Sequence, residues 1–288
     1  MMQSERVISV RLAQDAAQIE AAQRLRYDVF VRELGGDGAM VDHDAGLERD
    51  RFDPFFDHLL AFDDTAGGKV VGVYRVLRAD QAAAAGQFYS EDEYDLSVLR
   101  ASGRRLLELG RSCLHRDYRG GPVMFHLWQG LANYVQTHDI DVMFGVASFH
   151  GIDAQALASP LSLLHHRHLA PPDLRVRARQ FQPMDLVAEA DLDRRAAMLQ
   201  VPALIKAYLR LGGFVGEGAF VDHAFNTTGQ RSTFCLHFGN LLCVEITKHD
   251  IGTQFGQFQR KTLTHSLRTT GDQKCFSINI HNSLPLLM

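Results

Sequence analysis

The segment from Leu106 to Pro122 constrains the fold more than any other, because it joins an apolar strand to a helix through a basic turn. The first positions fit a strand, and residues 122–136 have helical spacing with proline at the favoured first position. The free N–H groups and positive end of a helix attract anions, and Gly120 and Gly121 let backbone approach closely. The junction therefore predicts a phosphate ligand, although a plain strand-to-helix turn would explain the glycines alone.

Charged residues flank this turn on both sides. Glu108 and Arg111 lie three residues apart near the end of the predicted strand, and Arg116 and Arg119 lie in the turn itself. A carboxylate at such a position can accept a proton, and an arginine can grip a phosphate. Two interpretations of Glu108 and Arg111 stay open here: a functional pair, or an ion pair that only stabilises the strand.

Composition excludes several classes of protein. The chain has 288 residues, of which 46% are hydrophobic, so it can bury a large core. Its formal net charge of -4 gives no overall signature of nucleic-acid binding, although arginines cluster at 104–105, 116–119 and 175–179. The first residues lack a signal peptide, and no apolar run approaches the length of a membrane span. We expect a cytoplasmic enzyme with no nucleic-acid partner.

The segment after Thr228 differs in composition from the rest of the chain. It contains no alanine, after an alanine-rich body, and lysine there equals arginine. Cys235, Cys243 and Cys275 lie in it, without the dense pattern of a secreted disulfide scaffold. We therefore expect one domain over residues 1–228 and an atypical C-terminal segment over residues 229–288, interpreted as a replaced or frameshifted terminus.

Hydrophobic periodicity predicts alternating strands and helices, which indicates an α/β chain. Strands are expected at 8–12, 59–62, 70–77, 106–114 and 141–146, and helices at 16–33, 122–136, 153–168 and 201–211. The second and third strands should form a hairpin with Gly67 and Gly68 at its tip.

Five sequence pieces within residues 6–228 resemble the GNAT superfamily of N-acyltransferases, and within it the enzymes that acylate ornithine from acyl carrier protein. The pieces are LRYDVF at 25–30, FDPFFDHL at 52–59, GVYR at 72–75, the turn at 108–122, and LGGF with FVDHAFNTT at 211–228. The resemblance implies an α/β (α+β), GNAT-like fold with a mixed, mostly antiparallel sheet flanked by helices. Acyl-homoserine-lactone synthases look like relatives.

Two departures from this family pattern bear on function. Residues 116–121 do not match the Arg-x-x-Gly-x-Gly/Ala turn that normally binds coenzyme A, but a phosphopantetheine arm still fits. Ornithine acyltransferases would also continue after Thr228 with an apolar strand, whereas this chain reads Gly229-Gln230-Arg231. Whether the sheet is complete is therefore an open question for the structure.

The resemblance also implies a catalytic chemistry. Acylation requires a neutral amine, so a carboxylate must remove a proton from the α-ammonium group, directly or through water. Glu108 is the first candidate for this base, with Arg111 beside it in the catalytic site. Backbone N–H groups between Arg111 and Leu114 would stabilise the negative oxygen of the tetrahedral intermediate.

Binding residues follow from the same resemblance. Arg26 and Arg75 would hold the substrate carboxylate, while Asp53 and Asp57 would hold a cationic side chain. Each of the four could instead be a surface ion pair. The residues expected to bind the phosphopantetheine arm of acyl carrier protein are Arg116, Arg119, Gly120 and Gly121.

The expected function is transfer of a 3-hydroxyacyl chain from acyl carrier protein to the α-amine of L-ornithine, forming lyso-ornithine lipid. No resident cofactor is expected, because the donor supplies the phosphopantetheine arm. No metal site is expected either, since residues 165–168 and the cysteines lack two spaced ligand pairs. The apolar product implies weak peripheral contact with the inner membrane. Two alternatives stay open: an acyl-homoserine-lactone synthase using S-adenosylmethionine, and an inactive homologue that binds carrier protein.

Overall fold

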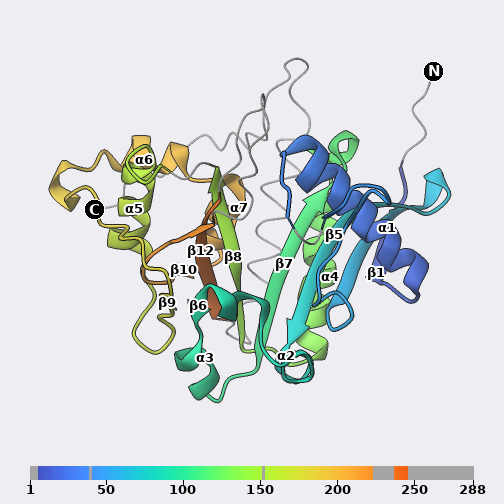
Figure 1. The fold of residues 1–288 in the computed structure, drawn as a ribbon, viewed down its shortest axis with the longest axis horizontal. Helices are drawn as coiled ribbons and strands as arrows, with labels where there is room; N and C mark the ends of the chain where they lie inside the picture. Colours follow the sequence, from blue (N-terminus) through green and yellow to red (C-terminus); the bar gives the residue numbers. More distant parts are fainter. Residues whose placement is uncertain (1–5, 39–40, 151–152, 223–236, 246–288) are drawn as a thin grey trace, which may run out of the picture.

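The structure, a computed structural model, describes residues 6–38, 41–150, 153–222 and 237–245. An eight-stranded sheet dominates it, in the order β1-β4-β5-β7-β8-β12-β10 with β11 paired to β12 (Figure 1). The strands are β1 (Ile8–Leu12), β4 (Asp57–Asp63), β5 (Lys69–Arg78), β7 (Leu106–Leu114), β8 (Val142–His150), β10 (Phe214–Val215), β11 (Phe220–Asp222) and β12 (His237–Glu245). Only β7 and β8 run parallel among these pairs. The predicted mixed, mostly antiparallel sheet is confirmed.

Helices cover both faces of the sheet. On one face α1 (Ala16–Arg26) continues into the wider π-helical turn η1 (Tyr27–Glu33), and on the other lies α4 (Val123–Thr137). Asp15 begins α1 by accepting the N–H of Gln18 at 2.8 Å, as the sequence predicts. The remaining helices are α2 (Ala79–Ala85), α3 (Ser97–Ala101), α5 (Ala158–His168), α6 (Arg194–Gln200) and α7 (Ala203–Arg210).

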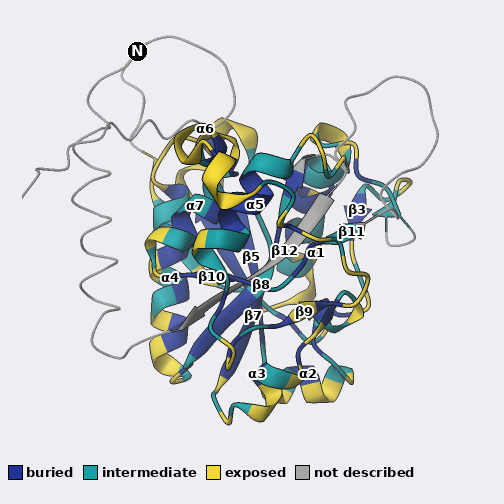
Figure 2. Cartoon of the chain, turned by 90° about the vertical axis from the view of Figure 1, so that its left-hand side faces the viewer, coloured by how far each residue is buried: buried dark blue, intermediate teal, exposed yellow. Residues whose placement is uncertain are grey.

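The alternation of side chains along β4 and β5 assigns each residue to a face. Leu60 and Val73 pack with α1, whereas Leu59 and Tyr74 pack with α4. Because β5 is covered on both sides, its sequence is a nearly continuous run of apolar residues. Figure 2 shows the central strands buried beneath partly exposed helices. The predicted hairpin of β4 and β5 is confirmed, with the turn η2 (Asp64–Ala66) at its tip.

The short elements lie between the main strands. They are the 3-10 turns η3 (Tyr89–Asp92), η4 (Arg116–Tyr118) and η5 (Glu189–Asp191), and the two-residue strand pairs β2 (Val41–Asp42) with β3 (Leu47–Glu48) and β6 (Tyr94–Asp95) with β9 (Arg177–Ala178). The helix expected over 153–168 begins only at Ala158, and α6 was not predicted. None of the helices in the described ranges is long and apolar enough to cross a membrane.

The two parallel strands separate soon after they meet. They pair only at Leu106–Val142, Leu107–Met143 and Glu108–Phe144, and then β7 continues beside β5 while β8 continues beside β12 (Figure 1). Gly145 lies where they part, and a Cβ atom there would stand 2.3 Å from the carbonyl oxygen of Leu109. A side chain is therefore excluded from this crossing point.

Strand β12 lies within the segment that we set apart by composition. It pairs with all nine residues of β8 and connects β8 to β10 and β11. No strand was expected here from the sequence, and the structure shows the sheet continued beyond β8. Residues 229–236 and 246–288, with Cys235 and Cys275, lie outside the described residues, and the interpretation of 229–288 as a replaced terminus stays a prediction.

Candidate active site

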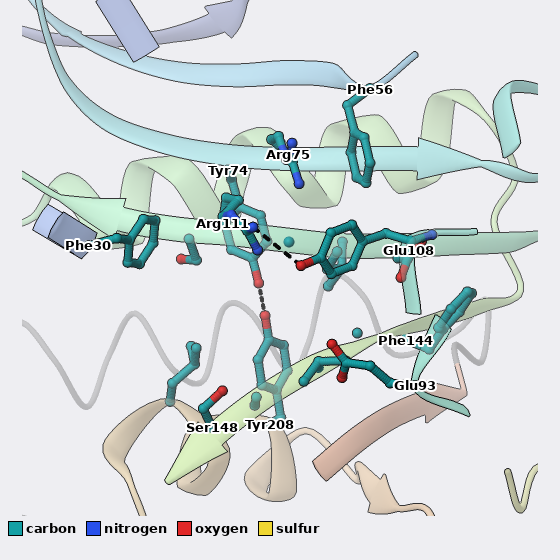
Figure 3. Close-up of a pocket in the computed structure, with 18 of the residues that line it drawn as sticks. Phe30, Phe56, Tyr74, Arg75, Glu93, Glu108, Arg111, Phe144, Ser148 and Tyr208 are labelled. Carbon is teal, nitrogen blue, oxygen red and sulfur yellow. Dashed lines mark hydrogen bonds between the residues drawn. The ribbon is translucent and has the colours of Figure 1, made fainter. Parts of the chain in front are cut away.

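A cavity of about 400 Å³ occupies the gap between β7 and β8 (Figure 3). It reaches both faces of the sheet, since its wall includes Phe30 and Leu34 from the η1 side and Tyr208 from the α7 side. The apolar lining also includes Val31, Phe56, Leu109, Met143, Phe144, Val146, Ala147, Pro202, Leu204 and Phe220. The charged lining residues are Glu48, Arg75, Glu93, Glu108 and Arg111. The cavity thus combines an apolar wall with a few charged groups, as ligand sites commonly do.

A β-bulge shapes the β7 wall of the cavity. Arg111 and Ser112 together stand opposite the single residue Tyr74 of β5, so neither has a pairing partner in that strand. Arg111 adopts the left-handed conformation, with φ of 51°, which is uncommon for a residue other than glycine. The bulge turns the Arg111 side chain into the gap, where it lines the cavity.

Glu108 lies at the closed end of the gap and is only 1% exposed. Its two carboxylate oxygens accept the backbone N–H groups of Tyr89 at 2.7 Å and Ser90 at 2.8 Å, the first donors of η3. Burial outweighs these bonds and raises the pKa of Glu108 to about 7. A carboxyl group with this pKa can exchange a proton near neutral pH. The structure does not pair Glu108 with Arg111.

Arg111 instead joins a buried cluster of alternating charges. Its Nε lies 3.1 Å from Oε1 of Glu48, and its Nη2 lies 3.7 Å from Oδ2 of Asp50 and 3.3 Å from the hydroxyl of Tyr89. Arg75 Nη1 lies 2.8 Å from the same Asp50 oxygen. Two cationic side chains, Arg75 and Arg111, therefore line the cavity. The carboxylates that neutralise them belong to Glu48 and Asp50.

Arg26 and Asp53 complete this cluster. One oxygen of Asp53 lies 2.6 Å from Nη1 of Arg26 and 2.5 Å from Nη1 of Arg75, and Arg26 also pairs with Glu48. Burial alone would raise the pKa of Asp53, but Arg26 and Arg75 hold it below its usual value. Arg26 is 0% exposed and does not line the cavity. These two side chains therefore face each other behind the cavity wall, and their contact with substrate stays a prediction.

Asp57 lies apart from Asp53. It follows the alternation of β4 onto the α4 face, where its Oδ2 accepts Nη1 of Arg78 at 2.7 Å and the hydroxyl of Tyr134 at 2.6 Å. Asp53 lies on the α1 face. The two aspartates therefore lie on opposite faces of the sheet, and the binding of a cationic side chain by either one stays a prediction.

The basic turn lies at the wide end of the gap, after β7. Arg116 is exposed, and Arg119 donates to the carbonyl of Leu114 at 3.1 Å and lies 2.7 Å from Oε2 of Glu33. Gly120 has φ of 75°, a conformation that favours glycine. Neither these residues nor Gly121 line the cavity. The structure places the predicted phosphate turn after β7 and outside the lining of the cavity.

Several site residues escaped the sequence analysis. Glu48, Asp50 and Tyr89 come from an acidic loop and a 3-10 turn without helical or strand periodicity, so no pattern marked them. Tyr208 belongs to the predicted helix over 201–211, but its position in the cavity depends on how α7 packs. The many acids of the loop before Asp53 were the one signal that could have pointed to Glu48 and Asp50.

Comparison with known proteins adds independent findings. The family model "Acetyltransferase (GNAT) domain" matches residues 25–129. The L-ornithine N(alpha)-acyltransferase of Rhodobacter capsulatus is 63% identical over 223 residues, which cover 76% of this chain and 86% of that protein. The one of Brucella abortus is 44% identical over 229 residues, covering 77% and 82%.

Solved structures with a similar course of the chain include acyl-homoserine-lactone synthases. LasI is 14% identical with a TM-score of 0.46, covering 88% of this chain and 96% of that one. The coenzyme A-dependent synthase MesI is 15% identical with a TM-score of 0.47, covering 92% and 97%. These synthases are thus among the structural neighbours of the chain, as expected from the sequence.

The separated parallel strands, the bulge and the matching family model together define an acyltransferase of the GNAT class. The high sequence identity to L-ornithine N(alpha)-acyltransferases, over most of both chains, identifies the family within this class. The chain belongs to the L-ornithine N(alpha)-acyltransferase family.

Proposed function

We propose that the protein transfers a 3-hydroxyacyl chain from acyl carrier protein to the α-amine of L-ornithine and so forms lyso-ornithine lipid. The observation that carries the proposal is the buried carboxyl of Glu108, with its pKa raised to about 7, at the closed end of an apolar cavity that also holds two arginines. The family to which the chain belongs, with relatives named for ornithine acylation, supports ornithine as the acceptor.

The proposed reaction uses the groups around the gap in order. Glu108 takes a proton from the α-ammonium group of the amino acid, directly or through water. The neutral nitrogen forms a bond to the thioester carbonyl carbon, and the backbone N–H groups of the Arg111–Ser112 bulge stabilise the negative oxygen. The C–S bond then breaks, the nitrogen gives up a second proton, and the thiolate of the carrier's arm takes up that proton and leaves as the thiol, while Glu108 releases its own proton to solvent.

The cations of the cavity suit the acceptor's carboxylate. Arg75 and Arg111 are the basic side chains among its described lining residues, and a guanidinium group can bind a carboxylate through two hydrogen bonds. The expected assignment of Arg75 to the carboxylate is retained in this proposal. Arg111 takes the place of Arg26, because Arg26 lies behind the wall.

The donor's arm fits the open edges of the gap. Past Glu108 and Phe144, the facing edges of β7 and β8 have no strand partner among the described residues. A phosphopantetheine arm carries amide groups that can hydrogen bond to such edges, as an added strand does. Its phosphate would then reach the basic turn, where Arg116, Arg119, Gly120 and Gly121 lie. Binding of acyl carrier protein belongs to the same proposal, as does a cytoplasmic enzyme in passing contact with the inner membrane.

The test is release of free thiol from 3-hydroxyacyl carrier protein with each amino acid in turn. L-Norvaline is the matched control, because it has the carbon chain of ornithine without the side-chain amine. We expect release that depends on ornithine and is at least about tenfold slower with norvaline. Release that requires S-adenosylmethionine, or carrier binding with no release for any acceptor, would overturn the proposal.

A further inference from the structure

Two buried tyrosines meet across the cavity. Tyr74 extends from β5 and Tyr208 from α7, and their hydroxyl groups share a hydrogen bond that bridges the two walls (Figure 3). The side chains are buried, with Tyr74 2% and Tyr208 6% exposed. Trp128 of α4 stacks on the ring of Tyr208, with centroids 5.9 Å apart and an interplanar angle of 26°. Two hydroxyl groups are therefore held in place beside a largely apolar cavity.

The hydrogen bonds of this pair are incomplete. Two phenol groups carry two O–H protons, and their mutual bond uses one of them. Within the described ranges, neither hydroxyl contacts another hydrogen-bonding group. Burial raises the pKa of Tyr208, so its hydroxyl keeps its proton near neutral pH. A ligand that brings one hydroxyl group into the cavity would satisfy the remaining donor.

The position of the pair determines which ligand atom it can reach. Tyr74 is the residue of β5 that stands opposite the Arg111–Ser112 bulge. In the proposed function the thioester carbonyl lies at this bulge, and carbon 3 of the acyl chain is two bonds away from the carbonyl carbon. The Oγ of Ser112 is also buried beside the cavity without a partner among the described residues. Hydroxyl groups thus gather where the start of the acyl chain must lie.

We propose that the Tyr74–Tyr208 pair binds the 3-hydroxyl group of the acyl chain and selects 3-hydroxyacyl donors over unsubstituted chains of the same length. This inference rests on the proposed function and adds the residues that choose the donor. An unsubstituted chain would leave a buried O–H donor facing methylene groups, which is costly. The pair therefore disfavours that chain by at least about tenfold.

The test compares kcat/KM for a 3-hydroxyacyl carrier protein and its unsubstituted counterpart in the wild type, Tyr74→Phe, Tyr208→Phe and the double variant. We expect the wild type to prefer the 3-hydroxyacyl donor by at least about tenfold, and the double variant to bring this ratio toward one. Each single variant still holds one O–H group without a partner, so it should keep part of the preference. Tyr27→Phe is the control, because Tyr27 is a buried tyrosine that bonds His43 at 3.0 Å outside the cavity.

The outcomes separate this inference from the proposed function. A wild type that uses both donors equally, or a double variant that keeps the wild-type ratio, would overturn the inference while ornithine acylation stands. Equal loss with both donors would also overturn it, because the pair would then serve a step common to both. The thermal midpoint of each variant shows whether it folds, and the wild-type ratio decides the question if a variant does not. No thiol release with any donor would instead overturn the proposed function.

Discussion

Glu108 lies under two opposing influences, and their balance sets its chemistry. Its oxygens accept two backbone N–H groups, which favour the charged carboxylate, while complete burial favours the neutral acid. Burial prevails and places the pKa at about 7, above the ordinary 4.5. The same two bonds hold the side chain still, so the group is both fixed in direction and able to exchange a proton at physiological pH.

The first prediction concerns Glu108→Gln. A base acts only when deprotonated, so kcat/KM of the wild type should rise with pH and level off above about 7. Glu108→Gln should lower kcat/KM by about 10²–10⁴ and remove this inflection. Thiol release measured across pH checks both effects.

The stability of the same two proteins tests the pKa without turnover. The folded wild type holds the proton more tightly than the unfolded chain, so its stability should fall as pH rises from about 4.5 to about 7. Glu108→Gln should lack this fall, which amounts to about 3 kcal/mol. Glu20→Gln, in an exposed ion pair with Arg24, should behave as the wild type does. If the stability of Glu108→Gln and of the wild type changed with pH in the same way, Glu108 would not have the raised pKa that the proposed base requires.

The sequence predicted individual residues unevenly, for a physical reason. Glu108 and Arg111 were singled out because a strand and a turn mark them locally, and both line the cavity. Arg26 was assigned to substrate from the family resemblance, and its partner Glu48 comes from a two-residue strand 22 positions away that no pattern indicates. Burial of a charge depends on such distant partners, so sequence alone did not distinguish a binding arginine from a neutralised one.

Among the elements, β7 and β8 create the site by parting. A parallel pair normally continues its hydrogen-bond ladder, but β7 and β8 stop pairing after Glu108 and Phe144. Gly145 of β8 makes a close contact there, and β7 continues through the bulge at Arg111 and Ser112, paired with β5 on either side of it. The cavity exists because the two strands pair only up to Glu108 and Phe144 and separate beyond Gly145. Glycine at position 145 is therefore a condition for the site's geometry.

The second prediction concerns Gly145→Ala. A Cβ atom would lie 2.3 Å from the carbonyl oxygen of Leu109, and backbone cannot yield as a flexible side chain can. We expect a loss of about 2 kcal/mol in the free energy of unfolding, measured by denaturant titration. Gly110→Ala is the control, because nothing lies within 4 Å of its Cβ position and its φ is not positive, so its change should stay within about 0.5 kcal/mol. Equal stability of the two variants would contradict close packing at position 145.

Elements with local signals were predicted from sequence, and elements that depend on distant partners were not. Asp15 and the apolar spacing after it indicated α1, and the alternation around Gly67 and Gly68 indicated the β4–β5 hairpin. The strands β10 and β11 contain two and three residues, too few to show a period. Both pair with β12, which lies outside the predicted domain.

At the scale of the whole molecule, the cavity reaches both faces of the sheet, and the residues that line it differ in chemistry between the two faces. The α1 face holds the buried charges that orient Arg75 and Arg111, and the α4 face holds Tyr74 and Tyr208. In the proposed reaction, the polar acceptor approaches from the first face and the acyl chain extends along the second. In this proposal, chemistry at the gap uses both halves of the sheet, including the half beyond β8.

The last prediction follows from this dependence on β12. A chain ending at Thr228 lacks the strand that pairs with all of β8, so β8 would carry an unpaired edge beside the cavity. We expect it to lose a large fraction of the roughly 5–15 kcal/mol typical of a domain, and with it ornithine-dependent thiol release. A chain ending at Glu245 keeps β12 and is the matched control.

Amide hydrogen exchange in Val142–His150 measures the effect directly, because these residues pair with β12. Fast exchange there in the chain ending at Thr228, and slow exchange in the one ending at Glu245, would show that the compositionally unusual segment supplies a working strand. Equal protection and equal activity in both chains would contradict the role of β12 and leave residues 1–228 as the complete catalytic unit.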